Sequence, residues 1–451
     1  MTDLRSFLDE VRNKRPADVV EVEREVDPCH ETAAIVTKLE QRGRSPILMF
    51  RNVKGCGLTV VTNVCGSMGR LAMALRCALP DVGRVYGERV QNRIAPQLVA
   101  DAPCQEVVQR DVDLGILPRL RYHLDDADEP YITAAIVVAR DPESGKSNLS
   151  YHRLMIAGPD RTGILMEKGK HLDGIFRKYA AAGRDMPIAA FVGAHPLWSL
   201  GALYSGSPGD EEYDCIGGLL GQPLPLVRCV TQPDLAVPAG TELVLEGVVT
   251  HAERMREGPF GEFTGYGTGL TQTPVFRVQA ITHRSDFMFQ DIVSGRMEHL
   301  VLSMPAIEER TRRVASQHVD VERVALPAPL TAVIAMRKRS DDEPARVIEA
   351  LLRSDIYCKH VFVVDADVDP GDMRAVLAAM ALQTQADRQV VILRDELGTP
   401  LDPSCPSPDG RSAKMGIDAT RPLQPVRSAT RNRLPQELLD AIDLDALLKR
   451  K

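Results

Sequence analysis

The sequence has no stretch approaching the roughly 18 consecutive apolar residues that a membrane-spanning helix needs. Its first 16 residues carry Asp3, Arg5 and Glu10 and no apolar run, so we expect no secretory signal. The cysteines are nine in number and scattered, and no two form a C-x-x-C motif. These absences predict a cytoplasmic protein without a membrane span, whose thiols are free and mostly buried.

An excess of basic residues is also missing. The net charge of −7 argues against a nucleic-acid partner. A hydrophobic content of 44% and a charged content of 26% are typical of a soluble globular protein. At roughly 150 residues per domain, a chain of 451 residues is expected to contain about three domains.

Hydrophobic patterning divides the chain into three units and a linker. Residues 1–105 combine helical periodicity with short apolar strands, which predicts an N-terminal α/β domain. Residues 106–296 show strand signals separated by turn residues and interrupted by one helix, which indicates a β-rich, barrel-like domain. Residues 297–320 read as a linker helix broken once at Pro305. Residues 321–451 alternate as β-α-β-α-β and end in an amphipathic helix, which predicts a C-terminal α/β domain with a parallel sheet.

The most distinctive stretch is Glu257-Gly258-Pro259-Phe260-Gly261-Glu262-Phe263-Thr264-Gly265-Tyr266-Gly267. It carries two carboxylates five residues apart. Because Pro lacks an N–H and Gly costs backbone entropy, this stretch predicts a shaped loop rather than a helix. Loops on rigid scaffolds often carry catalytic groups. The alternative is a solvated turn with two surface acids.

Three further stretches offer groups that could bind an anion or a metal. Arg153 follows Asn148-Leu149-Ser150-Tyr151-His152, and an arginine can hold a carboxylate or phosphate through two N–H donors. His171 begins a predicted helix, and Glu212 lies in a short acidic run. An Asn/His/Glu set suits Mn²⁺ or Mg²⁺ better than a structural zinc. Taken singly, residues of these types in such contexts are more often surface residues.

Two C-terminal stretches are less informative by themselves. Asp365-Ala366-Asp367-Val368-Asp369 is similar to half a calcium loop but lacks the Gly and Glu of an EF-hand, so we interpret it as a loop at a strand end. The segment Ser412 to Thr420 presents Lys414 among small residues. Lys414 could bind phosphate, although the spacing is not that of a P-loop, and a solvated lysine is the alternative.

Together these stretches resemble the UbiD family of decarboxylases, which use prenylated FMN. The similarity runs over nearly the whole chain, and its most specific parts are E-G-P-F-G-E-x-x-G-Y and K-M-G-I-D-A-T. The segments that carry it are Glu25-Val26-Asp27-Pro28, Asn148 to Arg153, Glu212-Tyr213-Asp214, residues 257–267, Val363 to Asp369, and Lys414 to Thr420.

The resemblance implies a fold, cofactors and partners. The fold would be an N-terminal α/β domain, a middle split β-barrel that is flavin-reductase-like and binds the cofactor, a linker helix, and a C-terminal α/β domain. The cofactor would be prenylated FMN, supplied by a flavin prenyltransferase and joined to the protein by Mn²⁺ (or Mg²⁺) with K⁺ (or Na⁺) beside it. Family members form homodimers or larger homo-oligomers, often exchanging C-terminal elements.

The resemblance also implies roles for particular residues. Arg153, Glu257 and Glu262 match the catalytic group. Asn148, His171 and Glu212 match the metal ligands. Residues implied to contact the cofactor are Asn148, Ser150, Arg153, Lys170, His171, Glu212 and Lys414. His152 and Lys170 depart from residues common in the family, so details of the pocket cannot be copied from relatives.

The chemistry agrees with these roles. Loss of CO₂ from an sp² carbon leaves an unstabilised carbanion unless a cofactor acts as electron sink. The protein must then orient the carboxylate, exclude water and deliver one proton. In the roles that the resemblance implies, Arg153 can orient the carboxylate, Glu257 can hold Arg153, and Glu262 can protonate the product. We therefore expect a reversible, non-oxidative decarboxylase acting on an α,β-unsaturated or (hetero)aromatic carboxylic acid. The alternatives are a flavin-independent metal hydrolase or lyase, and a non-catalytic cofactor-binding subunit.

Overall fold

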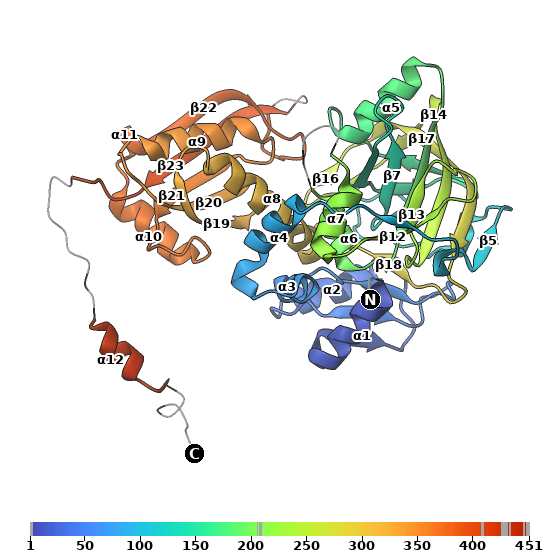
Figure 1. The fold of residues 1–451 in the computed structure, drawn as a ribbon, viewed down its shortest axis with the longest axis horizontal. Helices are drawn as coiled ribbons and strands as arrows, with labels where there is room; N and C mark the ends of the chain where they lie inside the picture. The colour runs from blue at the N-terminus through green and yellow to red at the C-terminus, as the bar shows by residue number, and fades with distance from the viewer. Residues whose placement is uncertain are drawn as a thin grey trace.

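The structure is a computed structural model that describes residues 3–204, 206, 210–406, 410–424, 432, 434–444 and 447. It shows an N-terminal α/β unit, a middle unit built on a curled half-barrel sheet, and a C-terminal α/β unit (Figure 1). A long helix, α8 (Met297–Ala315), lies between the middle and C-terminal units. This architecture confirms the predicted fold class. The exact domain boundaries stay a prediction.

The N-terminal unit is a four-stranded sheet with the order β1-β2-β3-β18. Its strands β1 and β2 are parallel, β2 and β3 are antiparallel, and β18 returns after the middle unit to pair in parallel with β3. The elements of this unit are α1 (Leu4–Lys14), β1 (Val19–Val22), α2 (Glu31–Glu40), β2 (Ile47–Phe50), β3 (Val60–Thr62), α3 (Met68–Leu75), α4 (Val82–Gln91) and β18 (Phe289–Asp291). The return of β18 ties the N-terminal unit to the middle unit.

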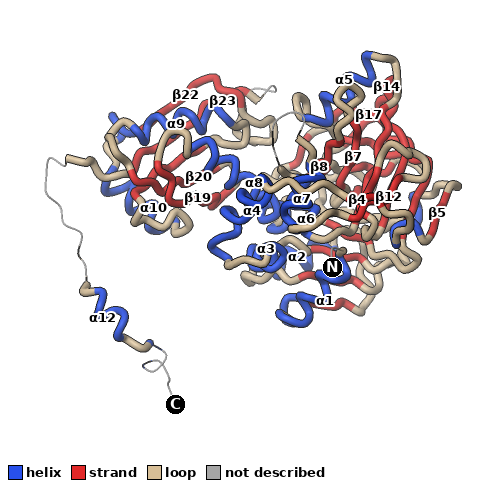
Figure 2. Tube along the Cα trace, viewed as in Figure 1, coloured by secondary structure: helices blue, strands red, loops and turns tan. Residues whose placement is uncertain are grey.

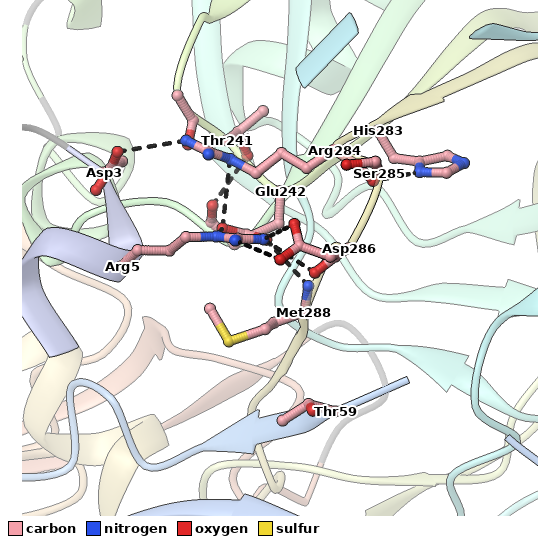
Figure 3. A network of polar contacts seen from close by, with 12 residues as sticks. Asp3, Arg5, Thr59, Thr241, Glu242, His283, Arg284, Ser285, Asp286 and Met288 are labelled. Atoms are coloured by element: carbon pink, nitrogen blue, oxygen red, sulfur yellow. Dashed lines mark hydrogen bonds and ion pairs between the residues drawn. The ribbon is translucent and has the colours of Figure 1, made fainter. Parts of the chain in front are cut away.

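A buried ion-pair network fastens α1 to the middle sheet (Figure 3). Glu242, fully buried just before β14, accepts hydrogen bonds from the Nε and Nη2 atoms of Arg5 at 2.9 and 2.8 Å. Arg284 lies 3.5 Å from the same carboxylate and pairs with Asp3, the N-cap residue of α1. A buried charge needs such partners because an unpaired one costs several kcal/mol. The network therefore sets the position of α1.

The middle unit contains a nine-stranded sheet with the order β6-β9-β10-β17-β14-β11-β7-β8, to which β5 adds beside β17. Its elements are β5 (Val107–Gln109), β6 (Tyr131–Ile132), β7 (Ile136–Arg140), β8 (Ser147–Tyr151), β9 (Leu154–Ile156), β10 (Arg161–Ile164), α5 (His171–Ala181), β11 (Met186–Val192), β14 (Leu243–Glu257) and β17 (Thr271–His283). The strands form one curved layer in Figure 2. Helices α6 (Pro196–Ala202) and α7 (Glu212–Leu220) pack against β8.

The curl of this sheet follows from one very short connection. His152 and Arg153 alone join β8, at one edge of the sheet, to β9, next to the other edge. Three peptide steps span at most about 11 Å. The two edges must therefore approach each other, and Arg153 lies at the seam. Two small additional sheets complete the unit: β13 (Ala236–Pro238), β12 (Pro225–Arg228) and β4 (Gln97–Leu98), and the pair β15 (Phe260–Gly261) and β16 (Gly267–Thr268).

Helix α8 runs without interruption from Met297 to Ala315, so the break predicted at Pro305 is wrong. A proline inside a helix removes one backbone hydrogen bond. In α8 that loss is offset by packing against α4, α6 and α9, since tertiary contacts supply most of the stability of a helix. Pro305 itself is buried among these contacts.

The C-terminal unit is a five-stranded sheet with the order β19-β20-β21-β23-β22. Its elements are β19 (Asp320–Ala328), β20 (Thr331–Arg337), α9 (Glu343–Ser354), β21 (His360–Asp365), α10 (Met373–Gln383), α11 (Ala386–Gln389), β22 (Val390–Leu397) and β23 (Arg411–Ala419). The predicted β-α-β-α-β order is present, but the sheet is mixed. The central strands β20, β21 and β23 are parallel, whereas β19 and β22 run antiparallel at the edges.

The last helix with described bounds is α12 (Gln436–Ala441), which lies within the helix predicted from Leu434 to Leu448, and residues 442 and 443 beyond it are not helical. Leu448 lies outside the described residues. All nine cysteines are free, as predicted. Among the helices described, none is both long and apolar enough to cross a membrane.

Candidate active site

Arg153 lies between two glutamates that are distant in sequence. Its Nε and Nη2 atoms donate to the two carboxylate oxygens of Glu257, each at 2.8 Å, and its Nη1 donates to Glu262 at 2.5 Å. Thr268 accepts a further bond from Nη2 at 3.2 Å. The side chains of Arg153, Glu257 and Glu262 are 8%, 1% and 13% exposed. The structure therefore brings together the three residues predicted as the catalytic group.

Local packing explains why these residues meet. Glu257 ends the long strand β14, and the chain then turns through Gly258, whose φ of +88° is readily adopted only by glycine. Tyr131 accepts a hydrogen bond from the Gly258 N–H at 3.1 Å. The ring of Phe260 lies 4.2 Å from that of Tyr131, and the Arg153 guanidinium lies 4.8 Å from the Phe260 ring centre. These contacts hold the loop against the arginine.

Burial and charge act in opposite directions on the ionisable groups of this cluster. Burial lowers the pKa of Arg153, but its hydrogen bonds and ion pairs with Glu257 and Glu262 outweigh burial, and the net pKa is raised. Burial raises the pKa of Glu262, and the Arg153 charge offsets this only in part. Arg153 therefore stays cationic, whereas Glu262 is biased toward its protonated form.

A second group of polar side chains lies along one face of β8 and continues to His152, the residue after it. Asn148, Ser150 and His152 are two residues apart, so they point to the same side of the strand. The Asn148 amide N–H donates to Ser150 Oγ at 3.1 Å, and Ser150 Oγ lies 2.8 Å from His152 Nε2. His152 Nδ1 lies 2.7 Å from the Leu165 carbonyl oxygen and must donate to it. Ser150 is therefore the donor to Nε2, and the Asn148 carbonyl oxygen is left for another ligand.

His152 is held as a neutral imidazole by its surroundings. Burial lowers the pKa of His152 to about 4, although the bond to Leu165 opposes this. A neutral ring with Nδ1 protonated can accept a hydrogen bond from Ser150 at Nε2. We call this chain of hydrogen bonds, from Asn148 through Ser150 and His152 to the Leu165 carbonyl, the relay.

The residues predicted as metal ligands fit a divalent cation. Glu212, the first residue of α7, is 4% exposed, and burial raises its pKa to about 8. Its carboxylate accepts from the Leu149 N–H at 3.3 Å, and none of the described salt bridges supplies it with a cation. A buried carboxylate that has no cation among the described salt bridges suits a bound metal ion. Asn148 is also buried, and His171 is exposed at the start of α5.

The three candidate ligands come from elements that contact one another, because β8 packs against both α5 and α7. Across the described residues, no group of three or more His, Cys, Asp or Glu side chains is placed to hold a metal. The predicted set differs from such a group, since one of its members is an asparagine. Two oxygen donors and one imidazole match the preferences of Mn²⁺.

Ser150, Lys170 and Lys414, which were also predicted to contact the cofactor, lie in different parts of the fold. Ser150 is part of the relay on β8. Lys170 is the N-cap residue of α5, and its ammonium lies 5.0 Å from the ring centre of Tyr357 in the C-terminal unit. Lys414 is buried in β23, and its ammonium donates to the carbonyl oxygens of Leu352 and Asp355 at 2.7 and 2.8 Å. These carbonyls compete with the phosphate contact predicted for Lys414.

Sequence reasoning missed four residues around the cluster. Tyr131 and Thr268 contact the Glu257 loop and Arg153. His299 packs edge-on against Phe263 at 6.0 Å, and Tyr357 does so at 5.9 Å. Each lies in an ordinary strand, helix or turn of the sequence, so no local motif distinguishes it.

A surface hollow of about 540 Å³ beside α1 is not part of this cluster. It is lined by Arg5, Arg12 and Arg51 among others. Arg5 is paired with Glu242 and Asp286, Arg12 with Asp9 and Glu21, and Arg51 with Glu21. Their charges are therefore already balanced within the protein, which disfavours an anion site there.

Three sequence profiles match consecutive parts of the chain. Residues 12–90 match the 3-octaprenyl-4-hydroxybenzoate carboxy-lyase N-terminal domain. Residues 97–297 match the Rift-related domain of the same carboxy-lyase family, which is UbiD, and residues 302–419 match its C-terminal domain.

Individual proteins and solved structures also match this chain over nearly its whole length. The anhydromevalonate phosphate decarboxylase of Methanosarcina mazei is 31% identical over 433 residues, covering 94% of this chain and 98% of that protein. The UbiD-class enzyme HmfF from Pelotomaculum thermopropionicum, in complex with FMN, has a TM-score of 0.91 and 38% identity, covering 99% of this chain and 100% of that one. An evolved dimeric form of HmfF in complex with prFMN has a TM-score of 0.87 and 36% identity, with the same coverage.

Proposed function

This chain belongs to the UbiD family and is a carboxy-lyase, and from that premise we propose that it uses prenylated FMN to decarboxylate an α,β-unsaturated or (hetero)aromatic carboxylic acid reversibly. The observation that carries the proposal is the buried cluster of Arg153, Glu257 and Glu262. A carboxy-lyase must bind a carboxylate, exclude water and deliver a proton. Arg153 is suited to the first task and Glu262 to the last, and the burial of the cluster limits the access of water.

Arg153 is the residue that orients the substrate carboxylate. Glu257 occupies two of its N–H donors in a bidentate pair, which fixes the plane of the guanidinium. Glu262 occupies one donor through a single contact. A substrate carboxylate can take that donor when Glu262 turns toward the reacting carbon. Glu257 therefore positions Arg153, and Glu262 is the group free to move.

Glu262 is the proton donor to the product carbon. Its raised pKa keeps a proton on the carboxyl group at a pH where an exposed glutamate would have lost it. In the reverse direction the same carboxylate removes that proton. When bound, prenylated FMN would supply the electron sink that makes loss of CO₂ possible.

Asn148, His171 and Glu212 are proposed to hold Mn²⁺ (or Mg²⁺), with K⁺ (or Na⁺) beside it. The burial of the Glu212 carboxylate, which has no cation among the described ion pairs, supports this assignment. The divalent ion would join the cofactor phosphate to the protein. Ser150 and Lys170 lie next to these ligands and are proposed to contact the cofactor. For Lys414 the same role remains a proposal with competing partners inside the fold.

The proposed partners are a flavin prenyltransferase, which supplies the cofactor, and further copies of this chain. The apolar side chains at the end of the chain support self-association. Their exposed fractions are 72%, 61%, 46% and 50% for Leu434, Leu438, Leu439 and Ile442. So many exposed large apolar residues on one short segment indicate a contact surface.

The function is tested with protein co-expressed with a flavin prenyltransferase and purified with Mn²⁺. A panel of acrylic, aryl and heteroaryl acids is assayed for release of CO₂, and the absorbance spectrum reports bound flavin. Release from one class of acid by flavin-containing protein supports the proposal. Hydrolase or lyase activity without a flavin band would support a metal enzyme instead. Bound flavin without turnover of any acid would indicate a cofactor-binding subunit.

A further inference from the structure

Tyr357 reaches out of the C-terminal unit and touches two loops of the middle unit. It lies in the turn between α9 and β21. Its hydroxyl donates to Glu167 Oε2 at 2.7 Å, and the Lys170 ammonium lies 5.0 Å from its ring centre. On another side its ring meets Phe263 edge-on at 5.9 Å. One side chain therefore joins two segments that are almost a hundred residues apart in the sequence.

The turn that carries Tyr357 is held firmly from its own side. Asp355 Oδ1 accepts the Tyr357 N–H at 2.9 Å, and the other oxygen of Asp355 pairs with Arg310 of α8. The Lys414 ammonium donates to the carbonyl oxygens of Leu352 and Asp355. These bonds fix the turn to both α8 and the C-terminal sheet. The ring is thus presented to the middle unit in one place.

Both loops that Tyr357 touches adjoin residues of the proposed function. Lys170 immediately precedes His171, a proposed metal ligand. Phe263 immediately follows Glu262, the proposed acid. A hydrogen bond to a carboxylate and a cation–π contact are directional, so they restrict where each loop can lie.

We propose that Tyr357 is a positioning residue: it seats the C-terminal unit across the two loops and so holds His171 and Glu262 where the reaction needs them. This inference rests on the proposed function for its catalytic part. Its structural part, the ordering of both loops by one side chain, does not. Lys414 acts in the same assembly by supporting the turn that presents Tyr357.

The first experiment uses the full chain without flavin and measures amide hydrogen exchange. Tyr357→Ala removes all three contacts, and Tyr357→Phe removes only the bond to Glu167. Tyr179→Ala is the matched control, because Tyr179 also donates its hydroxyl, to the Arg140 carbonyl, and also carries a cation over its ring, from Arg184. We expect faster exchange in residues 165–171 and 262–267 of Tyr357→Ala, and no change there in the control.

The second experiment uses Mn²⁺ and the flavin-loaded enzyme. Tyr357→Ala is expected to bind Mn²⁺ more weakly and to lower kcat by about tenfold to a hundredfold, with a smaller change in KM. Tyr357→Phe, which keeps both ring contacts, should recover most of kcat. Trypsin should also cut faster after Lys168 and Lys170 in Tyr357→Ala, since both residues are exposed on the loop that is released.

The outcomes separate this inference from the proposed function. Unchanged exchange in both segments of Tyr357→Ala overturns the ordering by Tyr357, whether or not the enzyme decarboxylates any acid. Faster exchange with unchanged Mn²⁺ affinity and unchanged kcat overturns the positioning role. If wild-type protein turns over no acid, the proposed function fails, and exchange together with Mn²⁺ affinity still decides whether Tyr357 holds the two loops.

Discussion

Glu257 and Glu262 have the same side chain, but their surroundings make them differently suited to transfer a proton. Glu257 is 1% exposed and gives both oxygens to Arg153. Glu262 is 13% exposed and gives one oxygen to Arg153. To transfer a proton, a carboxyl group must release its partners and face the substrate, and Glu262 has fewer bonds to Arg153 to release than Glu257 has. This difference supports the proposal that Glu262, rather than Glu257, is the acid.

Glu262→Gln tests this assignment. Glutamine keeps the shape and can still accept from Arg153, but it cannot release a proton. We expect a normal flavin spectrum and CO₂ release at least about a hundredfold slower than wild type. In D₂O, deuterium should enter the product slowly. Glu253→Gln is the control, since Glu253 is an exposed glutamate on β14 that pairs with Arg277. Near-normal turnover by Glu262→Gln would transfer the acid role to Glu257 or to water.

His152→Ala tests the relay that orients Asn148. Without His152, Ser150 loses the acceptor for its proton, and the Asn148 amide is free to rotate. Loss of a group that orients a metal ligand typically weakens metal binding by about tenfold to a hundredfold. We expect that loss in Mn²⁺ affinity by titration calorimetry. His171→Ala removes a proposed metal ligand, so it should weaken Mn²⁺ binding more than His152→Ala does. It should also release the flavin.

The control for the relay is His251→Ala, because His251 is paired with Asp185 on an exposed part of β14. Its Mn²⁺ affinity should equal that of wild type. If His152→Ala binds Mn²⁺ with wild-type affinity, His152 is not needed to orient Asn148. Full flavin retention by His171→Ala after chelation would make His171 an ordinary residue at a helix start.

At the scale of elements, a buried carboxylate of α8 helps to join this helix to the N-terminal unit. Glu298 is fully buried and accepts the N–H groups of Asn63 and Cys65, each at 2.7 Å. Burial raises its pKa from 4.5 to about 7, although these bonds oppose the shift. The folded protein therefore binds this proton more tightly than the unfolded chain does.

This shift predicts how stability depends on pH. The contribution of Glu298 is most favourable below the unfolded pKa and declines as the pH rises through the folded pKa, by about 3 kcal/mol in total. Thermal unfolding between pH 4.5 and 7 should show this decline in wild type. In Glu298→Gln, which does not titrate, the dependence of Tm on pH should be shallower. If Tm depends on pH equally in the two proteins, the pKa of Glu298 is not raised.

Some elements were predictable from the sequence because their apolar residues repeat. In α1, Leu4, Phe7, Leu8 and Val11 recur at helical spacing, and all are buried. Strand β23 shows the limit. Its inward residues are Ser412, Lys414, Gly416 and Asp418, which are polar or small, so no apolar alternation marks a strand. For the same reason the antiparallel placement of β22 beside β23 was not predictable.

At the scale of the whole molecule, the site is built from segments that the sequence keeps apart. Arg153 lies 104 residues from Glu257 and 109 from Glu262. Nothing in the spacing of one short motif indicates this approach, and it was expected only from the resemblance to a family. Tyr131, His299 and Tyr357 lie in no recognised motif. Their place near the site depends on how the sheet curls and how the C-terminal unit docks, which are long-range effects of packing.

The end of the chain gives a prediction about assembly. Leu438 and Leu439 of α12 are 61% and 46% exposed, and deletion of residues 433–451 should weaken self-association. Light scattering should report a smaller mass for the deletion and for the double substitution Leu438→Gln with Leu439→Gln. Asp440→Asn, on the same helix, is the control. An unchanged mass for all three would mean that α12 is not needed for assembly.

In the function that we propose, this chain decarboxylates an acid with a prenylated flavin bound beside Arg153, Glu257 and Glu262. The most direct measurement compares CO₂ release by protein produced with and without a flavin prenyltransferase, at equal Mn²⁺ and with the same unsaturated or aromatic acid. We expect release by the first preparation, little by the second, and loss of release in Glu262→Gln of the first. Equal release by both preparations would contradict the proposal.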